Sequence, residues 1–327
     1  MPTRLAEVAL KVGVSEATVS RVLNGKPGVS DATRLAVLAA LDTLGYERPS
    51  QLRGMKGRLV GLVLPELLNP IFPALAEVVG GSLTQLGYIP VLCTRTAGGL
   101  TEAEYITMLL DQQVSGVVFC GGLKASQYQH LIDREVAVVL LNAAVDYEGF
   151  PQVSTDDAAA VDYAYTHLAS LGHRRIGLLV GPGDHVPTRR KIEAFQRRCS
   201  RDGVASPPVA LTLFSFEGGH SAATELLRHD VTGIICGSDV MALGAIRSIR
   251  RAGLEVPGDV SVVGFDDSAF MNYTDPPLTT IRQPIESMAR AAVTLLVNQF
   301  TGAPTPKELL HDPELVVRCS TGPAPVG

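Results

Sequence analysis

Residues 59–265 alternate short apolar runs with segments of helical periodicity, and this alternation constrains the fold more than any other feature. Strands that alternate with helices of about 10–15 residues form parallel sheets with crossover helices. The alternation restarts near Ala159, which predicts an α/β core of two successive lobes. The predicted strands are 59–65, 88–93, 116–121, 137–142, 152–156, 175–181, 209–214, 233–237 and 260–265.

Polar residues follow most of these strands. They are Glu66 with Asn69, Gly121, Asn142, Asp156 with Asp157, Gly181, Ser238 with Asp239, and Asp266 with Asp267. Open parallel sheets bind ligands beyond the carboxyl ends of their strands. Two lobes whose polar strand ends face each other predict a site for a small polar ligand between them.

The first sixty residues predict a helix-turn-helix unit. An apolar stripe at helical spacing ends at Gly13, and Ser15 is placed to cap a second helix. Ser30 is placed to cap a third. The apolar stripe of the first helix comprises Leu5, Val8, Ala9 and Val12. The apolar stripe of the third helix comprises Ala32, Leu35, Leu38, Ala39, Leu41 and Leu44.

The second helix of such a unit enters the major groove of DNA. Arg21 can bind guanine and Ala17 can meet a thymine methyl, with Glu16 beside them. Four polar residues are placed to bind phosphates, namely Ser15, Thr18, Ser20 and Asn24. A three-helix bundle that binds protein is the alternative.

Taken alone, the net charge of −5 opposes this interpretation, since DNA is a polyanion. The distribution is uneven, since residues 1–60 carry +4 and the remainder −9. Such asymmetry favours a basic module for a polyanion, although a charge of this size also arises by chance.

Several classes of protein are not supported. No apolar stretch reaches the ~18 residues of a membrane helix. No cofactor, metal or hydrolase motif is present, so we expect no enzyme, cofactor or metal. Four histidines show no metal spacing and are expected at the surface or in caps, namely His167, His173, His185 and His220. The five scattered cysteines are expected to be buried thiols in a reducing cytoplasm.

These motifs carry a family resemblance. The segment VSEATVSRVLNG at 14–25 resembles the LacI family of bacterial transcriptional regulators, and further matching segments extend it over 4–320. The resemblance implies a headpiece at 1–47, a hinge at 48–58 and a core at 59–327 resembling periplasmic sugar-binding proteins. Within the core it implies lobe 1 at about 59–156 plus 285–309 and lobe 2 at about 157–284 plus 310–320.

The hinge of this family inserts an apolar side chain into the minor groove, and Met55 takes that place here. Such wedges kink DNA by unstacking a base step. The hinge departs from the family, because Pro49 lies one residue late and the segment is about three residues short. A plain solvated linker is the alternative.

The resemblance also implies which residues bind an effector. They are Phe72, Asn142, Asp156, His185, Lys191, Phe214, Ser238 and Asp266. Lys191 stands where the family usually has arginine, which removes a planar fork of donors. Hydroxyl-facing groups beside an aromatic platform favour a sugar. Structural caps are the alternative for each polar residue.

Several segments, such as TDPPLTT at 274–280, also resemble actinobacterial maltose-type regulators. We therefore expect a homodimeric repressor that binds operator DNA and a maltose or α-glucoside effector, with no membrane partner. A regulator of this family with a non-sugar ligand is the alternative. A solute-binding protein for uptake would need a signal peptide and no helix-turn-helix.

Overall fold

The computed structural model describes residues 4–23, 28–43, 58–95, 99–121, 129–145 and 149–325. It divides the chain into two compact units, residues 1–57 and 58–327, which are described separately below.

The first unit contains a small helical core. Its helices are α1 (Arg4–Val12), α2 (Glu16–Leu23) and α3 (Asp31–Thr43). Val8, Val19 and Val37 are fully buried where the three helices meet. The predicted stripe on α3 is partly wrong, because Leu35 is 68% exposed whereas Val37 and Ala40 face the core. Leu35 and Val37 lie two positions apart, so the two residues point to different sides of the helix.

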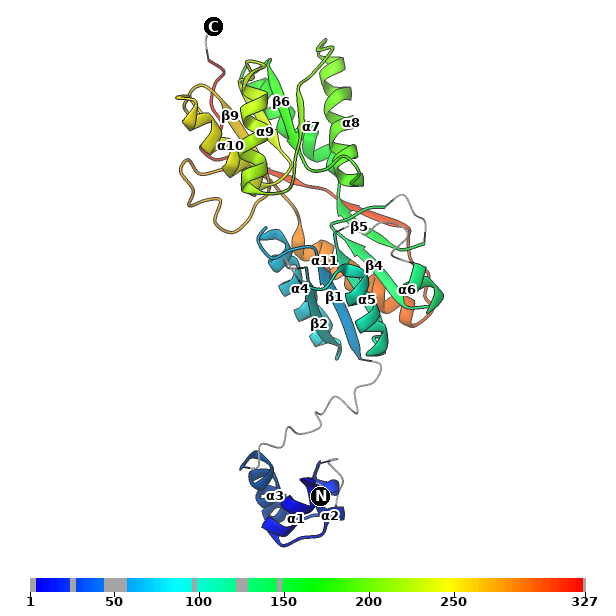
Figure 1. Cartoon of the computed structure of the whole chain (residues 1–327). Coiled ribbons are helices and arrows are strands. Elements are labelled where there is room, and N and C mark those ends of the chain that lie inside the picture. Colours follow the sequence, from blue (N-terminus) through cyan, green and yellow to red (C-terminus); the bar gives the residue numbers. More distant parts are fainter. Residues whose placement is uncertain are drawn as a thin grey trace. The chain divides into compact units, whose positions relative to one another are not determined.

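The second unit consists of two lobes, each built on a six-stranded sheet (Figure 1). The sheet of lobe 1 has the order β11-β5-β4-β3-β1-β2. Its strands are β1 (Leu59–Leu64), β2 (Ile89–Thr94), β3 (Gly116–Cys120), β4 (Ala137–Leu141), β5 (Gln152–Thr155) and β11 (Glu308–His311). The helices of this lobe are α4 (Ile71–Gln85), α5 (Glu102–Asp111), α6 (Gln129–Asp133) and α11 (Ile285–Phe300).

The sheet of lobe 2 has the order β12-β10-β9-β8-β6-β7, and only the pairing of β12 with β10 is antiparallel. Its strands are β6 (Ile176–Val180), β7 (Val209–Leu211), β8 (Gly233–Cys236), β9 (Ser261–Asp266), β10 (Thr279–Arg282) and β12 (Glu314–Val316). Its helices are α7 (Asp157–Ser170), α8 (Val186–Arg201), α9 (Phe216–Leu227) and α10 (Asp239–Arg251).

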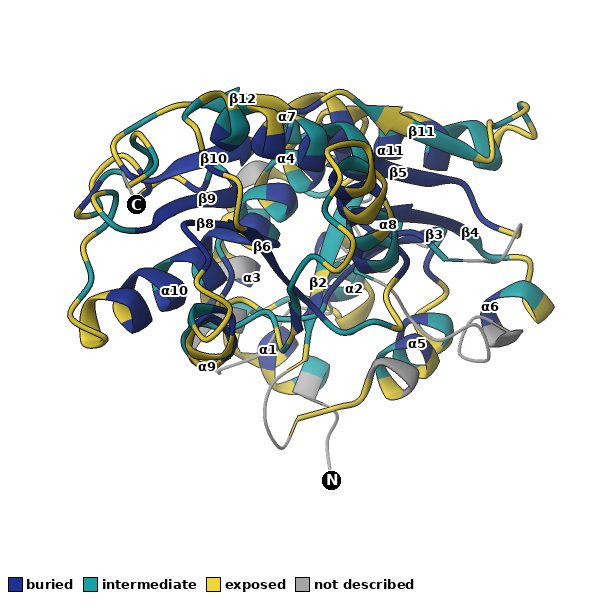
Figure 2. Ribbon diagram, turned by 90° about the horizontal axis from the view of Figure 1, so that it is seen from above, coloured by how far each residue is buried: buried dark blue, intermediate teal, exposed yellow. Residues whose placement is uncertain are grey.

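Helices cover both faces of each sheet (Figure 2), and the central strands β3, β6 and β9 are buried along their whole length, whereas the edge strands β2 and β7 are only partly buried. Neighbouring residues of one strand enter different cores. Val118 packs with α4 and α11, whereas Val117 and Phe119 pack with α5. This burial on both faces explains why the strands are almost continuously apolar.

The chain passes between the lobes three times, as the green, orange and red connections of Figure 1 show. The first crossover leads from β5 to α7, the second from β10 to α11, and the third from β11 to β12. The third crossover lies at 312–313, slightly after the change of lobe expected at about 309–310, because β11 continues to His311. Thr155 and His311 are opposite each other in the sheet, so the first and third crossovers lie side by side.

Two expectations about side-chain burial were wrong. His173 is buried, and its ring nitrogens lie 3.0 Å from the hydroxyls of Thr232 and Ser261. Cys319 is exposed, whereas the other four cysteines are buried free thiols.

Candidate functional site

The helix α2 presents one polar face and one apolar face. Its apolar face carries Val19 and Val22, which are buried against α1 and α3. Glu16, Ala17 and Arg21 are exposed. The exposed residues are those predicted to meet base edges.

Ser15 and Thr18 form the N-terminal cap of this helix. The Thr18 amide donates to Oγ of Ser15 over 3.2 Å, and the two hydroxyl oxygens lie 2.9 Å apart. Ser20 is half-buried. The remaining two predicted DNA contacts, Asn24 and Met55, lie outside the described residues, as does most of the predicted hinge.

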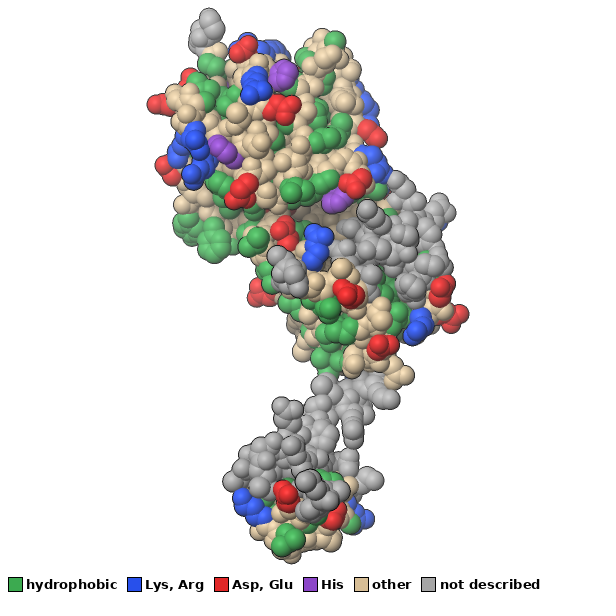
Figure 3. All heavy atoms as spheres, in the orientation of Figure 1, with side chains coloured by type: hydrophobic (Ala, Val, Ile, Leu, Met, Phe, Trp, Pro, Cys, Tyr) green, Lys and Arg blue, Asp and Glu red, His purple; other side chains and the backbone are tan. Residues whose placement is uncertain are grey.

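The charged side chains of the second unit are mixed on the face shown in Figure 3. Lys and Arg side chains alternate there with Asp and Glu over both lobes. The described residues on this face therefore form no extended basic surface of the kind that follows a DNA backbone.

In lobe 2 the polar strand ends lie at one edge, because β6, β8 and β9 run parallel. Asp266 ends β9 and Ser238 follows β8. The Ser238 hydroxyl is buried and accepts from the Met241 amide over 3.3 Å. Ser238 therefore has a capping role at the start of α10, whatever else it binds.

In lobe 1 two further predicted residues follow strands. Asp156 caps α7, and its Oδ1 accepts from the amides of Ala158 and Ala159 over 2.9 and 3.0 Å. Asn142 follows β4 with φ of 51°, a conformation in which asparagine is enriched. Its backbone amide donates to the Val153 carbonyl over 2.8 Å.

Asp266 is the most distinctive of the predicted residues. Its side chain is 3% exposed and its backbone has φ of 119°, a strained conformation for a residue with a side chain. Oδ1 accepts from Nε2 of Gln283 over 2.7 Å. Oδ2 is buried and makes no hydrogen bond with any described residue. A buried carboxylate oxygen without a donor is costly, which marks this atom as a place for a ligand.

The surroundings of Asp266 disfavour its charged form. Burial raises the pKa of its carboxyl well above the usual range, and the carboxylate of Asp239 raises it further. Gln283, Lys191 and Asn69 oppose this rise in the pKa. Asn69, from the loop before α4, acts on this carboxyl group through its side chain.

Lys191 is buried on α8 and forms an ion pair with Asp157, the first residue of α7. Its ammonium also lies 4.1 Å from the centre of the Phe265 ring. Burial raises the pKa of Asp157, and Lys191 acts in the opposite direction. Oδ2 of Asp157 has no partner among the described residues.

Asn69, Asp157, Lys191 and Asp266 are hereafter called the interlobe cluster, since they come from both lobes. Two of them, Lys191 and Asp266, were predicted as site residues. Asn69 and Asp157 were missed, although both stand among the polar strand ends in the sequence. Gln283, which binds the cluster, follows a strand that was not predicted.

Phe214 and His185 form a stacked pair on lobe 2. Their ring centres lie 6.0 Å apart with an angle of 22° between the planes. The Phe214 ring occupies the space beside Gly181, where a Cβ would lie 2.1 Å from two ring carbons. Phe72 lies on lobe 1 in the first turn of α4 and is partly buried against the core.

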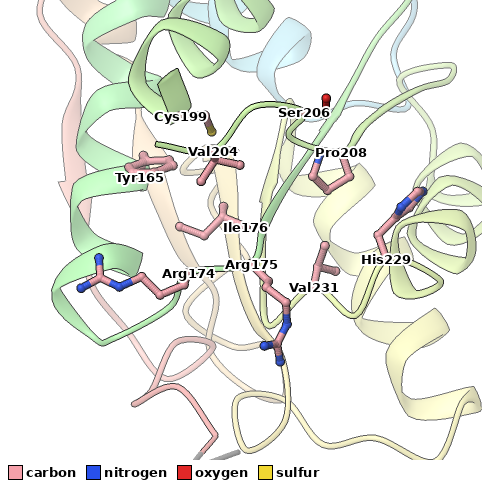
Figure 4. A pocket seen from close by; sticks show the side chains of 10 residues that line it. All are labelled: Tyr165, Arg174, Arg175, Ile176, Cys199, Val204, Ser206, Pro208, His229 and Val231. Carbon is pink, nitrogen blue, oxygen red and sulfur yellow. The ribbon is translucent and has the colours of Figure 1, made fainter. Parts of the chain in front are cut away.

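A separate pocket lies at the opposite edge of the lobe 2 sheet, near the start of β6 and the segments before β7 and β8 (Figure 4). Burial raises the pKa of its Cys199 thiol to about 11, so the thiol is protonated at neutral pH. The pocket therefore offers no thiolate nucleophile. Its lining residues are Tyr165, Arg174, Arg175, Ile176, Cys199, Val204, Ser206, Pro208, His229 and Val231.

The described residues contain no cluster of His, Cys, Asp and Glu that could hold a metal ion. None of their helices combines the length and the apolar character needed to span a membrane.

Each of the two units matches a known protein family. Residues 4–49 match the family described as bacterial regulatory proteins, lacI family, and residues 165–321 match a periplasmic binding protein-like domain. The chain is 52% identical to the HTH-type transcriptional regulator MalR of Streptomyces coelicolor, over 99% of this chain and 98% of that protein.

Two solved structures resemble the whole chain. A complex of the transcriptional regulator CelR with cellobiose has a TM-score of 0.74 and 33% identity, covering 98% of this chain and all of that one. A lac repressor dimer bound to operator and the anti-inducer ONPF has a TM-score of 0.76 and 28% identity, with the same coverage.

Proposed function

Because the chain belongs to the LacI family and is a helix-turn-helix transcriptional regulator, we propose that it is a homodimeric repressor controlled by a small neutral sugar. The sugar binds at the interlobe cluster, and the headpieces bind operator DNA. The observation that carries the proposal is the buried, unpartnered Oδ2 of Asp266. A hydroxyl group of a sugar supplies the missing donor.

The charges around the site favour a neutral ligand. Asp157, Asp239 and Asp266 are buried carboxyl groups, and Lys191 is already paired with Asp157. A phosphorylated sugar or a nucleotide would bring its charge toward these carboxyl groups, and the interlobe cluster, whose four residues are all described, has no cation besides the paired Lys191. A polyhydroxylated neutral molecule can donate to them instead.

Further residues are proposed as effector contacts around this centre. The stacked pair of Phe214 and His185 supplies a flat apolar surface for a sugar ring. Phe72, Asn142, Asp156 and Ser238 are proposed at the strand ends and the first turn of α4, in addition to their capping and packing roles.

Maltose or another α-glucoside is the proposed effector. The 52% identity to MalR over almost the whole chain supports this choice, together with the local resemblance to maltose-type regulators. The CelR complex with cellobiose supports a disaccharide more generally.

On DNA, the proposed base contacts are Glu16, Ala17 and Arg21, and the proposed phosphate contacts are Ser15, Thr18, Ser20 and Asn24. Met55 is proposed as the minor-groove wedge. Two headpieces related by two-fold symmetry read a pseudo-palindromic site. The lac repressor dimer on its operator supports this arrangement. A cytoplasmic location is proposed with it, because the proposed operator is bacterial DNA.

The test measures operator affinity with and without sugars. An operator fragment is first selected in vitro with the wild-type protein. Maltose, maltotriose, cellobiose and ribose are then titrated, with glucose 6-phosphate as the anionic comparison. We expect maltose to change operator affinity by about 5- to 150-fold, the usual range of such coupling, and glucose 6-phosphate to have no effect.

Asp266→Asn tests the site itself. Asparagine replaces one carboxyl oxygen by an NH2 group and so removes an acceptor, which should weaken sugar binding by about 5- to 150-fold, since a buried unsatisfied polar group costs about 1–3 kcal/mol. Calorimetry measures the sugar affinity, with Asp312→Asn on the exposed third crossover as the control. Equal sugar affinity in the Asp266→Asn variant would place the site elsewhere.

A further inference from the structure

A chain of two hydrogen bonds links Asp266 to the crossovers between the lobes. Nε2 of Gln283 donates to Oδ1 of Asp266 over 2.7 Å. Oε1 of the same amide accepts from the hydroxyl of Thr155, also over 2.7 Å. Gln283 lies on the second crossover and Thr155 at the start of the first. One side chain therefore contacts the cluster and two of the three crossovers.

The orientation of the Gln283 amide is fixed by its neighbours. The nitrogen of the amide faces Asp266 and donates to Oδ1, which accepts whether or not the other carboxyl oxygen carries a proton. The oxygen then faces Thr155, whose hydroxyl is the donor. Gln283 and Thr155 are 4% and 2% exposed, so water does not replace either bond cheaply.

The two oxygens of Asp266 have different partners. Oδ1 is held by Gln283, whereas Oδ2 has no donor. A donor that arrives at Oδ2 fixes the plane of the carboxylate group, and the other oxygen moves with that plane. Because Gln283 is bound to Thr155, the position of the carboxylate is transmitted to the backbone of both crossovers.

We propose that Gln283 and Thr155 are positioning residues that transmit occupancy of the Asp266 site to the interlobe crossovers. This inference rests on the proposed function, in which Asp266 receives a hydroxyl group of the effector. A ligand shifts a conformational equilibrium only through contacts that differ between the two states. The two hydrogen bonds that link Asp266, Gln283 and Thr155 supply such contacts, because the distances between these residues depend on how the crossovers are placed.

Thr155→Val is the central test, because valine has the shape of threonine but cannot donate to Gln283. The bond between Gln283 and Asp266 stays in place, so sugar affinity should change by no more than the effect of one neutral hydrogen bond, roughly 2- to 13-fold. The measured quantity is the ratio of operator Kd values with and without saturating maltose. We expect this ratio to fall roughly 2- to 30-fold toward one, the range found for residues that carry coupling.

Ser154→Ala is the matched control. Ser154 precedes Thr155 in β5, is equally buried, and its hydroxyl has no partner in the described part of the chain. It should leave the ratio unchanged. A merely structural role of Thr155 would lower the melting temperature without changing the ratio.

A second pair of variants tests the amide. Gln283→Ala should reduce both sugar affinity and the ratio. Gln299→Ala removes a glutamine of α11 that binds the backbone of Val138 within lobe 1, with Nε2 donating to the carbonyl over 3.0 Å. This control should lower stability but keep the ratio.

The outcomes separate the two proposals. A wild-type protein whose operator affinity no sugar of the panel changes overturns the proposed function, and the transmission with it. A wild-type protein that responds, together with a Thr155→Val variant of unchanged ratio, overturns the transmission alone. A reduced ratio in Thr155→Val with an unchanged ratio in Ser154→Ala supports both.

Discussion

Lys191 and Asp157 form a buried ion pair, and the Lys191 ammonium lies 4.1 Å from the centre of the Phe265 ring. Removing one member of a buried pair leaves a charge without compensation, which costs about 3–5 kcal/mol. Lys191→Met should therefore lower the free energy of unfolding by this amount in urea titrations.

The double variant Lys191→Met with Asp157→Asn should recover most of that loss, because neither charge remains. Replacing both members of a buried pair is often close to neutral. A double variant as unstable as Lys191→Met alone would show that the loss comes from packing rather than charge.

Gly181→Ala should displace the Phe214 ring, because a Cβ at this position would lie 2.1 Å from two ring carbons. If Phe214 stacks on the sugar, calorimetry should show sugar affinity reduced about 10-fold, within the range of stacking contributions to binding. Gly183→Ala is the control, since its Cβ would lie 3.6 Å from Leu211. Equal affinities in the two variants would exclude Phe214 as the platform.

Arg21→Ala should weaken binding to the selected operator by about 1–3 kcal/mol, the contribution of one bidentate base contact. The helical core should remain, because Arg21 is exposed whereas Val19 and Val22 hold α2. Fluorescence anisotropy with labelled operator measures the affinity. Lys11→Ala, which removes an exposed positive charge from α1, is the comparison. An equal loss of operator affinity in the two variants would indicate a general contribution of positive charge rather than a base contact by Arg21.

The pH dependence of stability should carry a contribution from Asp239. Burial raises the pKa of this carboxyl from 3.8 to about 7. Between these values the folded protein holds a proton that the unfolded chain has released. The contribution is therefore fully present below about pH 4 and is lost as the pH rises to about 7.

Comparison with Asp239→Asn measures this contribution together with the effect of Asp239 on Asp266, whose pKa the Asp239 carboxylate raises. The free energy of unfolding of the wild type relative to the variant should decrease from pH 4 to pH 7, by at most about 1.4 kcal/mol per pH unit. A constant difference over this range would contradict the raised pKa.

Much of the fold follows from local sequence patterns. Strands buried on both faces read as apolar runs, and the Ser15 cap of α2 lies where the sequence places it. The sequence did not show which apolar residues of α3 are buried. Leu35 and Val37 are both apolar, and only the packing of α1 and α2 against α3 decides which of them is buried.

The candidate site was predictable to a lesser extent. Asp266 and Lys191 stand in recognisable segments, but their partners come from elsewhere in the chain. Gln283 reaches Asp266 only because β10 lies beside β9, and that pairing is a property of the sheet. His173 is a similar case, since its partners Thr232 and Ser261 come from segments distant in sequence.

The three crossovers set the mechanics of the core. The Asp156 amide donates to the His311 carbonyl over 2.9 Å, and Thr155 binds Gln283, so all three connections are tied together. Two bodies joined along one short line can fold about that line, but they cannot slide or twist freely. Any rotation of one lobe against the other must therefore pass through this one linked set of connections, and a small molecule bound between the lobes acts on all three together.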